Sequence, residues 1–292
     1  MTKNLKIKVS IVMNCFNSSK YLKEAIDSIY EQSYDNWEII FWDNQSTDNS
    51  ATIAKSYGKK LKYFLAKEHT TLGKARNLAL REATGDYIAF LDCDDLYLTD
   101  KIKIQLAAMQ EANAVCSYGG WIKIDSKGKE LAEYKMSNNY GEVFELFLSK
   151  YVVNFQTLML KSSLLKRENI SFDSNLKFST DHNLVLRIAY NWPVLSISNL
   201  LVKYRVHGES LSNNRKMDKM SDFDYTINFL EKLGAQKKYN NFKYLSSKVR
   251  LKMLLLDAFN DKNYKYFLQA IIQYLFLITK AFLSKSNIIG DF

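Results

Sequence analysis

The chain has 292 residues, of which 47% are hydrophobic and 25% are charged, and this composition excludes an intrinsically disordered protein. One proline and 10 glycines exclude collagen-like and proline-rich chains. The net charge of +10 indicates anionic partners. The chain has three cysteines, Cys15, Cys93 and Cys116, and their number and spacing predict neither a disulfide framework nor a zinc knuckle. Because the apolar run 9–13 is too short for a signal peptide, we expect a cytoplasmic protein in a reducing compartment.

Strand-like and helix-like patterns alternate along the first 125 residues. Short apolar, β-branched or aromatic runs predict strands at 9–13, 37–42, 61–65, 87–91 and 115–124. Helical spacing of apolar residues predicts helices at 21–30, 73–83 and 100–112, the last capped by Thr99. This order predicts right-handed βαβ units and therefore an α/β fold with a mostly parallel sheet.

The second half of the chain is less regular. We expect a helix at 141–150, a buried strand at 155–160, a helix opened by Thr180 and a strand at 194–205. From about residue 215 the pattern is helical to the end.

Polar side chains stand at the carboxyl ends of the predicted strands, where ligands bind in parallel sheets. Among them, Asp92, Asp94 and Asp95 lie within four positions. Carboxylates this close repel one another, and a bound cation would relieve the repulsion. Mn²⁺ or Mg²⁺ suits oxygen ligands and commonly shares its coordination with substrate phosphates. The alternative is an acidic turn in which Asp94 and Asp95 complement the dipole of the next helix. The position at a strand end favours the metal–diphosphate site.

Four ordered segments, 9–17, 42–48, 73–77 and 83–95, resemble family 2 glycosyltransferases of the bacterial surface-polysaccharide type with a GT-A fold. Weaker similarity continues to about residue 212. The resemblance implies a Rossmann-like, mostly parallel sheet flanked by helices. It implies a catalytic domain at 1–212, with a nucleotide-sugar half at about 1–125 and an acceptor half at about 126–212. A basic helical extension would occupy 213–292.

The resemblance also implies a donor site. Its residues would be Phe16, Asn17, Asp43, Asn44, Arg76, Asp92 and Cys93. Phe16 would pack on the nucleobase, Asp43 and Asn44 would reach the base or ribose, and Asp92 would hold the ribose. Many relatives have Asp at the position of Asn44, but an amide oxygen can also accept the uracil N–H. Arg76 would contact the nucleotide or the acidic cluster, with a structural ion pair as the alternative.

The implied reaction is an inverting, metal-dependent transfer from a UDP-hexose or UDP-N-acetylhexosamine to a saccharide or lipid-linked saccharide hydroxyl. Asp94, Asp95 and His207 would hold Mn²⁺ or Mg²⁺, although His207 could instead bind a phosphate or be structural. Asp181 would be the general base, because Thr180-Asp181 stands where the family has Glu-Asp. The alternative is that Asp181 only caps its helix. His69 is expected to have a surface role.

The last 80 residues carry 14 Lys and Arg against 7 Asp and Glu, interleaved with aromatic side chains. We expect 237–283 to contact the inner face of the cell membrane peripherally or to mediate self-association, and we expect no nucleic-acid partner. A helix buried against the catalytic domain is the alternative.

Two other enzyme classes and one non-enzyme class are alternatives to a glycosyltransferase. Residues 14–18 contain no glycine, which disfavours a sugar nucleotidyltransferase and a dinucleotide-dependent dehydrogenase. A non-catalytic nucleotide-sugar-binding protein is supported only by Thr180.

Overall fold

The computed structural model describes residues 7–208, 216–260, 268 and 271–272. The chain divides into two compact units. The first comprises Met1–Glu142 and Val153–Asn213, and the second comprises Val143–Val152 and Asn214–Phe292. The segment Val143–Val152 therefore belongs to the unit of the C-terminal helices.

The first unit is built on a 10-stranded sheet. Its strands are β1 (Val9–Cys15), β2 (Trp37–Asp43), β3 (Leu61–Leu65), β4 (Tyr87–Phe90), β5 (Leu96–Tyr97), β6 (Cys116–Ile124), β7 (Glu130–Tyr134), β8 (Asn139–Gly141), β9 (Met159–Lys161) and β10 (Val194–Arg205). Eight of them follow the order β3-β2-β1-β4-β9-β6-β10-β5, while β7 pairs with β6 and β8 pairs with β10. The pairs β3–β2, β2–β1, β1–β4 and β6–β10 are parallel. The short strand β9 is antiparallel to both neighbours.

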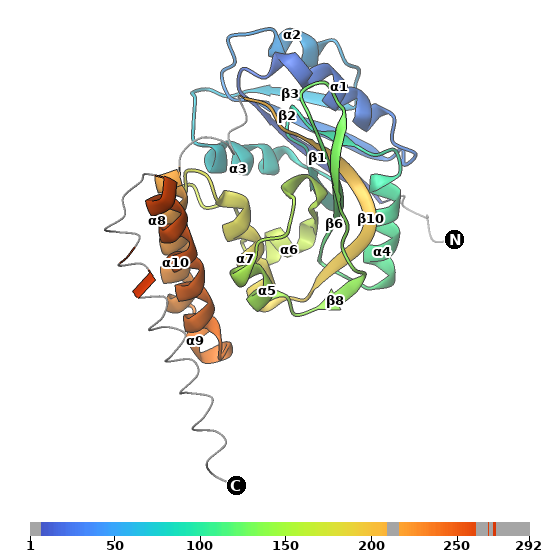
Figure 1. The fold of residues 1–292 in the computed structure, drawn as a ribbon. Helices are drawn as coiled ribbons and strands as arrows, with labels where there is room; N and C mark the ends of the chain where they lie inside the picture. The colour runs from blue at the N-terminus through green and yellow to red at the C-terminus, as the bar shows by residue number, and fades with distance from the viewer. Residues whose placement is uncertain (1–6, 209–215, 261–267, 269–270, 273–292) are drawn as a thin grey trace. The chain divides into compact units, whose positions relative to one another are not determined.

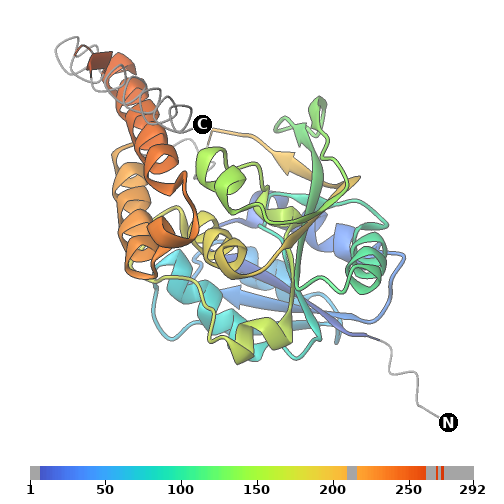
Figure 2. The ribbon, with the colours of Figure 1, turned by 90° about the horizontal axis from the view of Figure 1, so that it is seen from below.

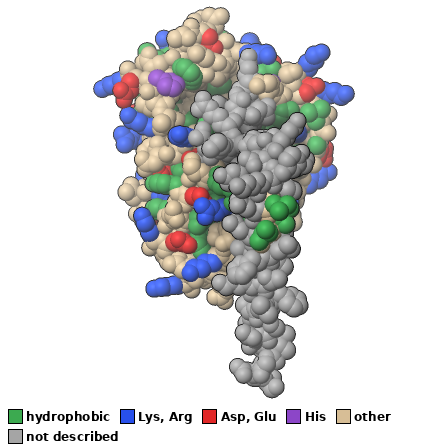
Figure 3. Space-filling model, turned by 60° about the vertical axis from the view of Figure 1, so that its left-hand side comes forward, with side chains coloured by type: hydrophobic (Ala, Val, Ile, Leu, Met, Phe, Trp, Pro, Cys, Tyr) green, Lys and Arg blue, Asp and Glu red, His purple; other side chains and the backbone are tan. Residues whose placement is uncertain are grey.

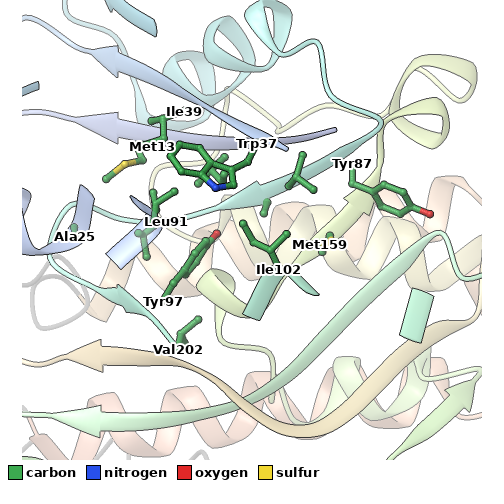
Figure 4. Close-up of a cluster of buried hydrophobic side chains, with 14 of the residues drawn as sticks. Met13, Ala25, Trp37, Ile39, Tyr87, Leu91, Tyr97, Ile102, Met159 and Val202 are labelled. Atoms are coloured by element: carbon green, nitrogen blue, oxygen red, sulfur yellow. The ribbon is translucent and has the colours of Figure 1, made fainter. Parts of the chain in front are cut away.

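Helices cover both faces of this sheet (Figures 1 and 2). They are α1 (Ser19–Tyr30), α2 (Ser50–Lys55), α3 (Leu72–Glu82), α4 (Lys101–Glu111), the 3₁₀ helix η1 (Phe155–Thr157), α6 (Ser162–Arg167) and α7 (Thr180–Asn191). Alternate residues of β1 point to one face, where Val9, Ile11 and Met13 pack with apolar residues of α1, α2 and α4. Figure 4 shows part of this core, including Met13 and Ile102.

Several elements differ from the sequence-based prediction. Helix α4 has Asp100, and not Thr99, as its N-cap residue. The predicted helix at 141–150 is shorter, because β8 precedes α5 (Phe144–Ser149). The predicted strand at 155–160 is the 3₁₀ turn η1 followed by β9, since the Asn154 side chain accepts a hydrogen bond from the Gln156 N–H and starts a turn.

The second unit is helical and contains α5, α8 (Lys216–Lys232), α9 (Ala235–Lys238) and α10 (Phe242–Asn260). Phe144 of α5 stacks on Tyr239 at 4.3 Å between ring centroids and lies 6.2 Å from Phe242. Within the described part of the chain, no helix has the length and apolar character to cross a membrane. The segment predicted to contact the membrane is 237–283. Of this segment, residues 261–267, 269–270 and 273–283 lie outside the described residues.

Basic side chains do not gather in one patch on the face drawn in Figure 3. Among the described residues visible there, Lys and Arg side chains are scattered, with acidic side chains between them. The positive charge on this face is therefore dispersed.

Candidate active site

The carboxyl ends of β1, β2 and β4 lie at one edge of the sheet. The parallel register pairs Cys15 of β1 with Asp43 of β2, and Val12 of β1 with Phe90 of β4. The loops that begin after these strands therefore start side by side. Most of the side chains that the sequence singled out lie in these loops, namely Phe16, Asn17, Asn44, Asp92, Cys93, Asp94 and Asp95. Asp43 ends β2, Arg76 lies on α3, Asp181 lies on α7 and His207 follows β10.

The loops after β1 and β3 bring two exposed rings together. Phe16, which is 49% exposed, lies 4.3 Å from His69 between ring centroids, at an interplanar angle of 55°. His69 is exposed, as expected, but its ring is held, because its Nδ1 lies 2.9 Å from the backbone oxygen of Asn44. The sequence offered no signal that the rings of Phe16 and His69 would meet.

The amide of Asn44 is used inside the protein. Its Nδ2 donates to the Thr70 carbonyl at 2.8 Å, and its Oδ1 accepts from the Thr70 N–H at 3.1 Å. Asn44 is buried, so this side chain fixes the loop that carries His69. A carboxylate at the same position could not donate to the Thr70 carbonyl, which gives a local reason for the amide.

Asp43 and Asn17 brace the same edge. Asp43 is fully buried, and its two oxygens accept hydrogen bonds from the Ser46 N–H at 2.7 Å and the Tyr63 hydroxyl at 2.6 Å. Asn17 has a positive φ of 51°, and its side-chain oxygen accepts from the Thr47 N–H at 2.7 Å. These bonds tie the loop after β1 to the loop after β2.

Cys93 is also buried, and its thiol donates to the Asn14 carbonyl at 3.4 Å. This bond joins the segment after β4 to the end of β1. The Cys93 side chain thus supports the backbone at the sheet edge.

Asp92 lies against Arg76. Arg76 Nη2 is 3.6 Å from Asp92 Oδ1, and Gln156 Nε2 donates to Asp92 Oδ2 at 2.8 Å. Arg76 is buried over the ring of Phe155, and its Nη1 donates to the Thr180 hydroxyl at 2.9 Å. Thr180 is therefore a hydrogen-bond partner of this arginine.

Asp94 and His207 come together, whereas Asp95 turns into the protein. His207 Nε2 lies 2.9 Å from Asp94 Oδ2, and both side chains retain some exposure. Asp95 is buried and accepts from the Arg205 N–H at 2.7 Å, while Arg205 itself pairs with Glu24 at 2.7 Å. Burial, followed by the charges of Asp94 and Asp92, raises the pKa of Asp95 well above its usual range.

The Asp94–His207 pair fits a divalent cation that shares its coordination with a substrate. Across residues 7–208 and 220–255, no three His, Cys, Asp or Glu side chains are grouped as a metal site. Mg²⁺ and Mn²⁺ sites commonly take only one or two protein ligands and complete their coordination with phosphate oxygens and water. The carboxylate oxygen of Asp94 is a suitable ligand for Mn²⁺ or Mg²⁺, and the imidazole nitrogen of His207 lies beside it.

Asp181 lies in the first turn of α7, but it is not the cap of that helix. The N-cap residue is Ser179. Burial raises the pKa of Asp92, Arg76 opposes this effect, and the charges of Asp94 and Asp181 add to it. The negative charge of Asp181 therefore acts on Asp92 of the acidic cluster.

Residues 10–189 match the family model described as Glycosyl transferase family 2. The chain belongs to this family. A relative in Rickettsia typhi, the uncharacterized glycosyltransferase RT0329, is 32% identical over 78% of this chain and 73% of its own length. Another, the UDP-Glc:alpha-D-GlcNAc-diphosphoundecaprenol beta-1,3-glucosyltransferase WfgD of Escherichia coli, is 28% identical over 76% of this chain and 87% of its own. Other relatives are longer, and the chain spans 33% of an uncharacterized glycosyltransferase of Rickettsia felis.

Solved structures of other glycosyltransferases share the fold. S. aureus TarS 1–349 in complex with UDP-GlcNAc has a TM-score of 0.71 at 22% identity, covering 90% of this chain and 79% of TarS. The mannosyltransferase PcManGT of Pyrobaculum calidifontis, in complex with GDP-Man and Mn²⁺, has a TM-score of 0.65 at 14% identity, covering 99% and 82%. This glycosyltransferase therefore has the predicted α/β fold of the GT-A class.

Proposed function

We propose that this glycosyltransferase transfers a sugar from a uridine diphosphate sugar, with inversion and with a divalent cation, to a hydroxyl of a saccharide or lipid-linked saccharide. The observation that carries the proposal is the Asp94–His207 pair, 2.9 Å apart and following Asp92 after β4. TarS, which binds UDP-GlcNAc, and WfgD, named for UDP-Glc, support this donor class.

Asp94 and His207 would hold the Mn²⁺ or Mg²⁺. The cation would stabilise the negative charge that builds up on the leaving diphosphate. Asp95 acts on the site indirectly, because its bond to the Arg205 N–H positions the segment that leads to His207. In this proposal Asp95 positions His207 and does not bind the cation as a third ligand.

The donor would lie across the edge formed by the loops after β1, β2 and β4. Phe16 would pack on the base, and Asp92, oriented by Arg76 and Gln156, would bind the ribose. Asn17, Asp43, Asn44 and Cys93 would shape this site through the loops that they hold, which their hydrogen bonds support.

Asp181 would take the proton of the acceptor hydroxyl as that oxygen attacks the sugar carbon from the face opposite the diphosphate. Its position in the first turn of α7, close to the acidic cluster, supports this role. The WfgD name, which includes a diphosphoundecaprenol-linked sugar, supports a lipid-linked acceptor. We also propose that 237–283 contacts the membrane peripherally or mediates self-association.

The test measures UDP release from UDP-glucose and UDP-N-acetylglucosamine with a lipid-linked saccharide acceptor, with and without MnCl₂. We expect release only with the cation, and a loss of at least about 100-fold in Asp94→Asn. Glu111→Gln is the matched control, because this carboxylate is exposed on α4. Cation-independent release, or equal rates in Asp94→Asn and wild type, would refute the proposal.

A further inference from the structure

The hydrogen bonds of His69 determine which of its ring nitrogens carries a proton. Nδ1 lies 2.9 Å from the backbone oxygen of Asn44, and a carbonyl oxygen can only accept a hydrogen bond. Nδ1 is also 3.4 Å from Asn44 Nδ2, but that amide already donates to the Thr70 carbonyl over the shorter distance of 2.8 Å. The Nδ1–H tautomer is therefore assigned from the network. In the neutral ring, Nε2 is then an acceptor.

The ring that carries this acceptor is fixed in place. Asn44, which holds Nδ1, is itself buried and bonded twice to the backbone of Thr70, the residue that follows His69. The ring of Phe16 also contacts the His69 ring, with 4.3 Å between the two ring centroids. A held acceptor next to an exposed aromatic ring can distinguish one planar heterocycle from another, because the ring stacks on any base whereas the acceptor requires a donor.

We propose that His69 selects the nucleobase of the donor by accepting a hydrogen bond at Nε2 from a ring N–H of the base. This assignment rests on the proposed function and specifies its substrate class. Uracil offers such a donor at N3, and guanine offers one at N1. Cytosine N3 and adenine N1 carry lone pairs, which would face the lone pair of Nε2. The site therefore accepts uridine or guanosine diphosphates and rejects cytidine and adenosine diphosphates.

With CDP or ADP, a lone pair of the base would face the lone pair of His69 Nε2 in a partly desolvated site, and neither acceptor would have a donor. Such an unpaired contact corresponds to about a 10-fold to 100-fold loss in affinity. CDP is the sharpest competitor, because it has nearly the shape of UDP and differs at the atom that His69 would read. N3-methyl-UDP removes the same N–H while keeping both carbonyl groups of uracil.

The experiment is isothermal titration calorimetry of UDP, GDP, CDP, ADP and N3-methyl-UDP against the full chain with MnCl₂. We expect UDP or GDP to bind about 10-fold to 100-fold more tightly than CDP, ADP and N3-methyl-UDP. In His69→Phe, which keeps a ring beside Phe16 but has no acceptor, these ratios fall to near one. His69→Gln, whose amide oxygen can accept, restores part of the preference.

Phe16→Ala separates stacking from selection. It weakens every nucleotide and leaves the ratio of UDP to CDP affinity in place, whereas a merely structural role of His69 would lower all affinities together. Equal binding of UDP, CDP and N3-methyl-UDP by wild type, or an unchanged preference in His69→Phe, overturns the assignment and leaves the proposed function intact. Binding of none of the nucleotides would overturn both.

Discussion

Lys101 is a buried lysine in the first turn of α4. Its side chain is 1% exposed, its ammonium lies 4.3 Å from the centre of the Tyr97 ring, and among the described residues its Nζ has no hydrogen-bond partner. Burial lowers its pKa from the usual 10.5 to about 7. The folded protein therefore resists the protonation that the unfolded chain accepts readily.

The sign and size of the effect follow from proton linkage. Between pH 10.5 and pH 7 the unfolded state binds more protons at Lys101, so the folded state loses stability as the pH falls. The difference between the two pKa values corresponds to a penalty of up to about 5 kcal/mol below pH 7, and about 2 kcal/mol at pH 9. Lys101→Met, which keeps the volume of the side chain without its charge, should remove this penalty.

The assay is urea unfolding followed by tryptophan fluorescence at pH 7 and pH 9. We expect Lys101→Met to be more stable than wild type by several kcal/mol at pH 7, with a smaller difference at pH 9. Lys103→Met is the control, because Lys103 is exposed on the same helix. A Lys101→Met protein no more stable than wild type, or a stability difference independent of pH, would refute the reasoning.

Three further predictions test the site and its supports. Asp181→Asn should lower turnover about 100-fold to 10,000-fold in the UDP-release assay while UDP affinity changes little, and unchanged turnover would exclude Asp181 as the base. Gly85→Ala should cost about 1–3 kcal/mol in urea unfolding, because the added Cβ would lie 2.6 Å from a backbone nitrogen of β1, whereas Gly58→Ala enters open space and should be neutral. Arg76→Lys should cost roughly 2 kcal/mol by losing a buried guanidinium hydrogen bond, and exposed Arg81→Lys should not; equal stabilities would contradict the buried pairing.

The partners of the site residues depend on contacts between distant parts of the chain, and the sequence could not predict them. Gln156 meets Asp92 across 64 positions, and the Arg205 N–H meets Asp95 across 110. For that reason the three aspartates at 92, 94 and 95, which look equivalent in the sequence, have different environments. One faces Arg76, one faces His207 and one is buried.

By itself, the sequence determined the alternation of strands and helices around one sheet edge and the family, because side-chain periodicity and strand-end chemistry are local properties. It predicted β10 at 194–205 with the bounds that the structure has. Only the tertiary structure decided that Asn44 clamps Thr70, that His69 pairs with Phe16, and that 143–152 packs with the C-terminal helices. Each of these contacts forms because the fold brings two segments within hydrogen-bonding or packing distance. The periodicity of side chains along the sequence does not determine which segments come that close.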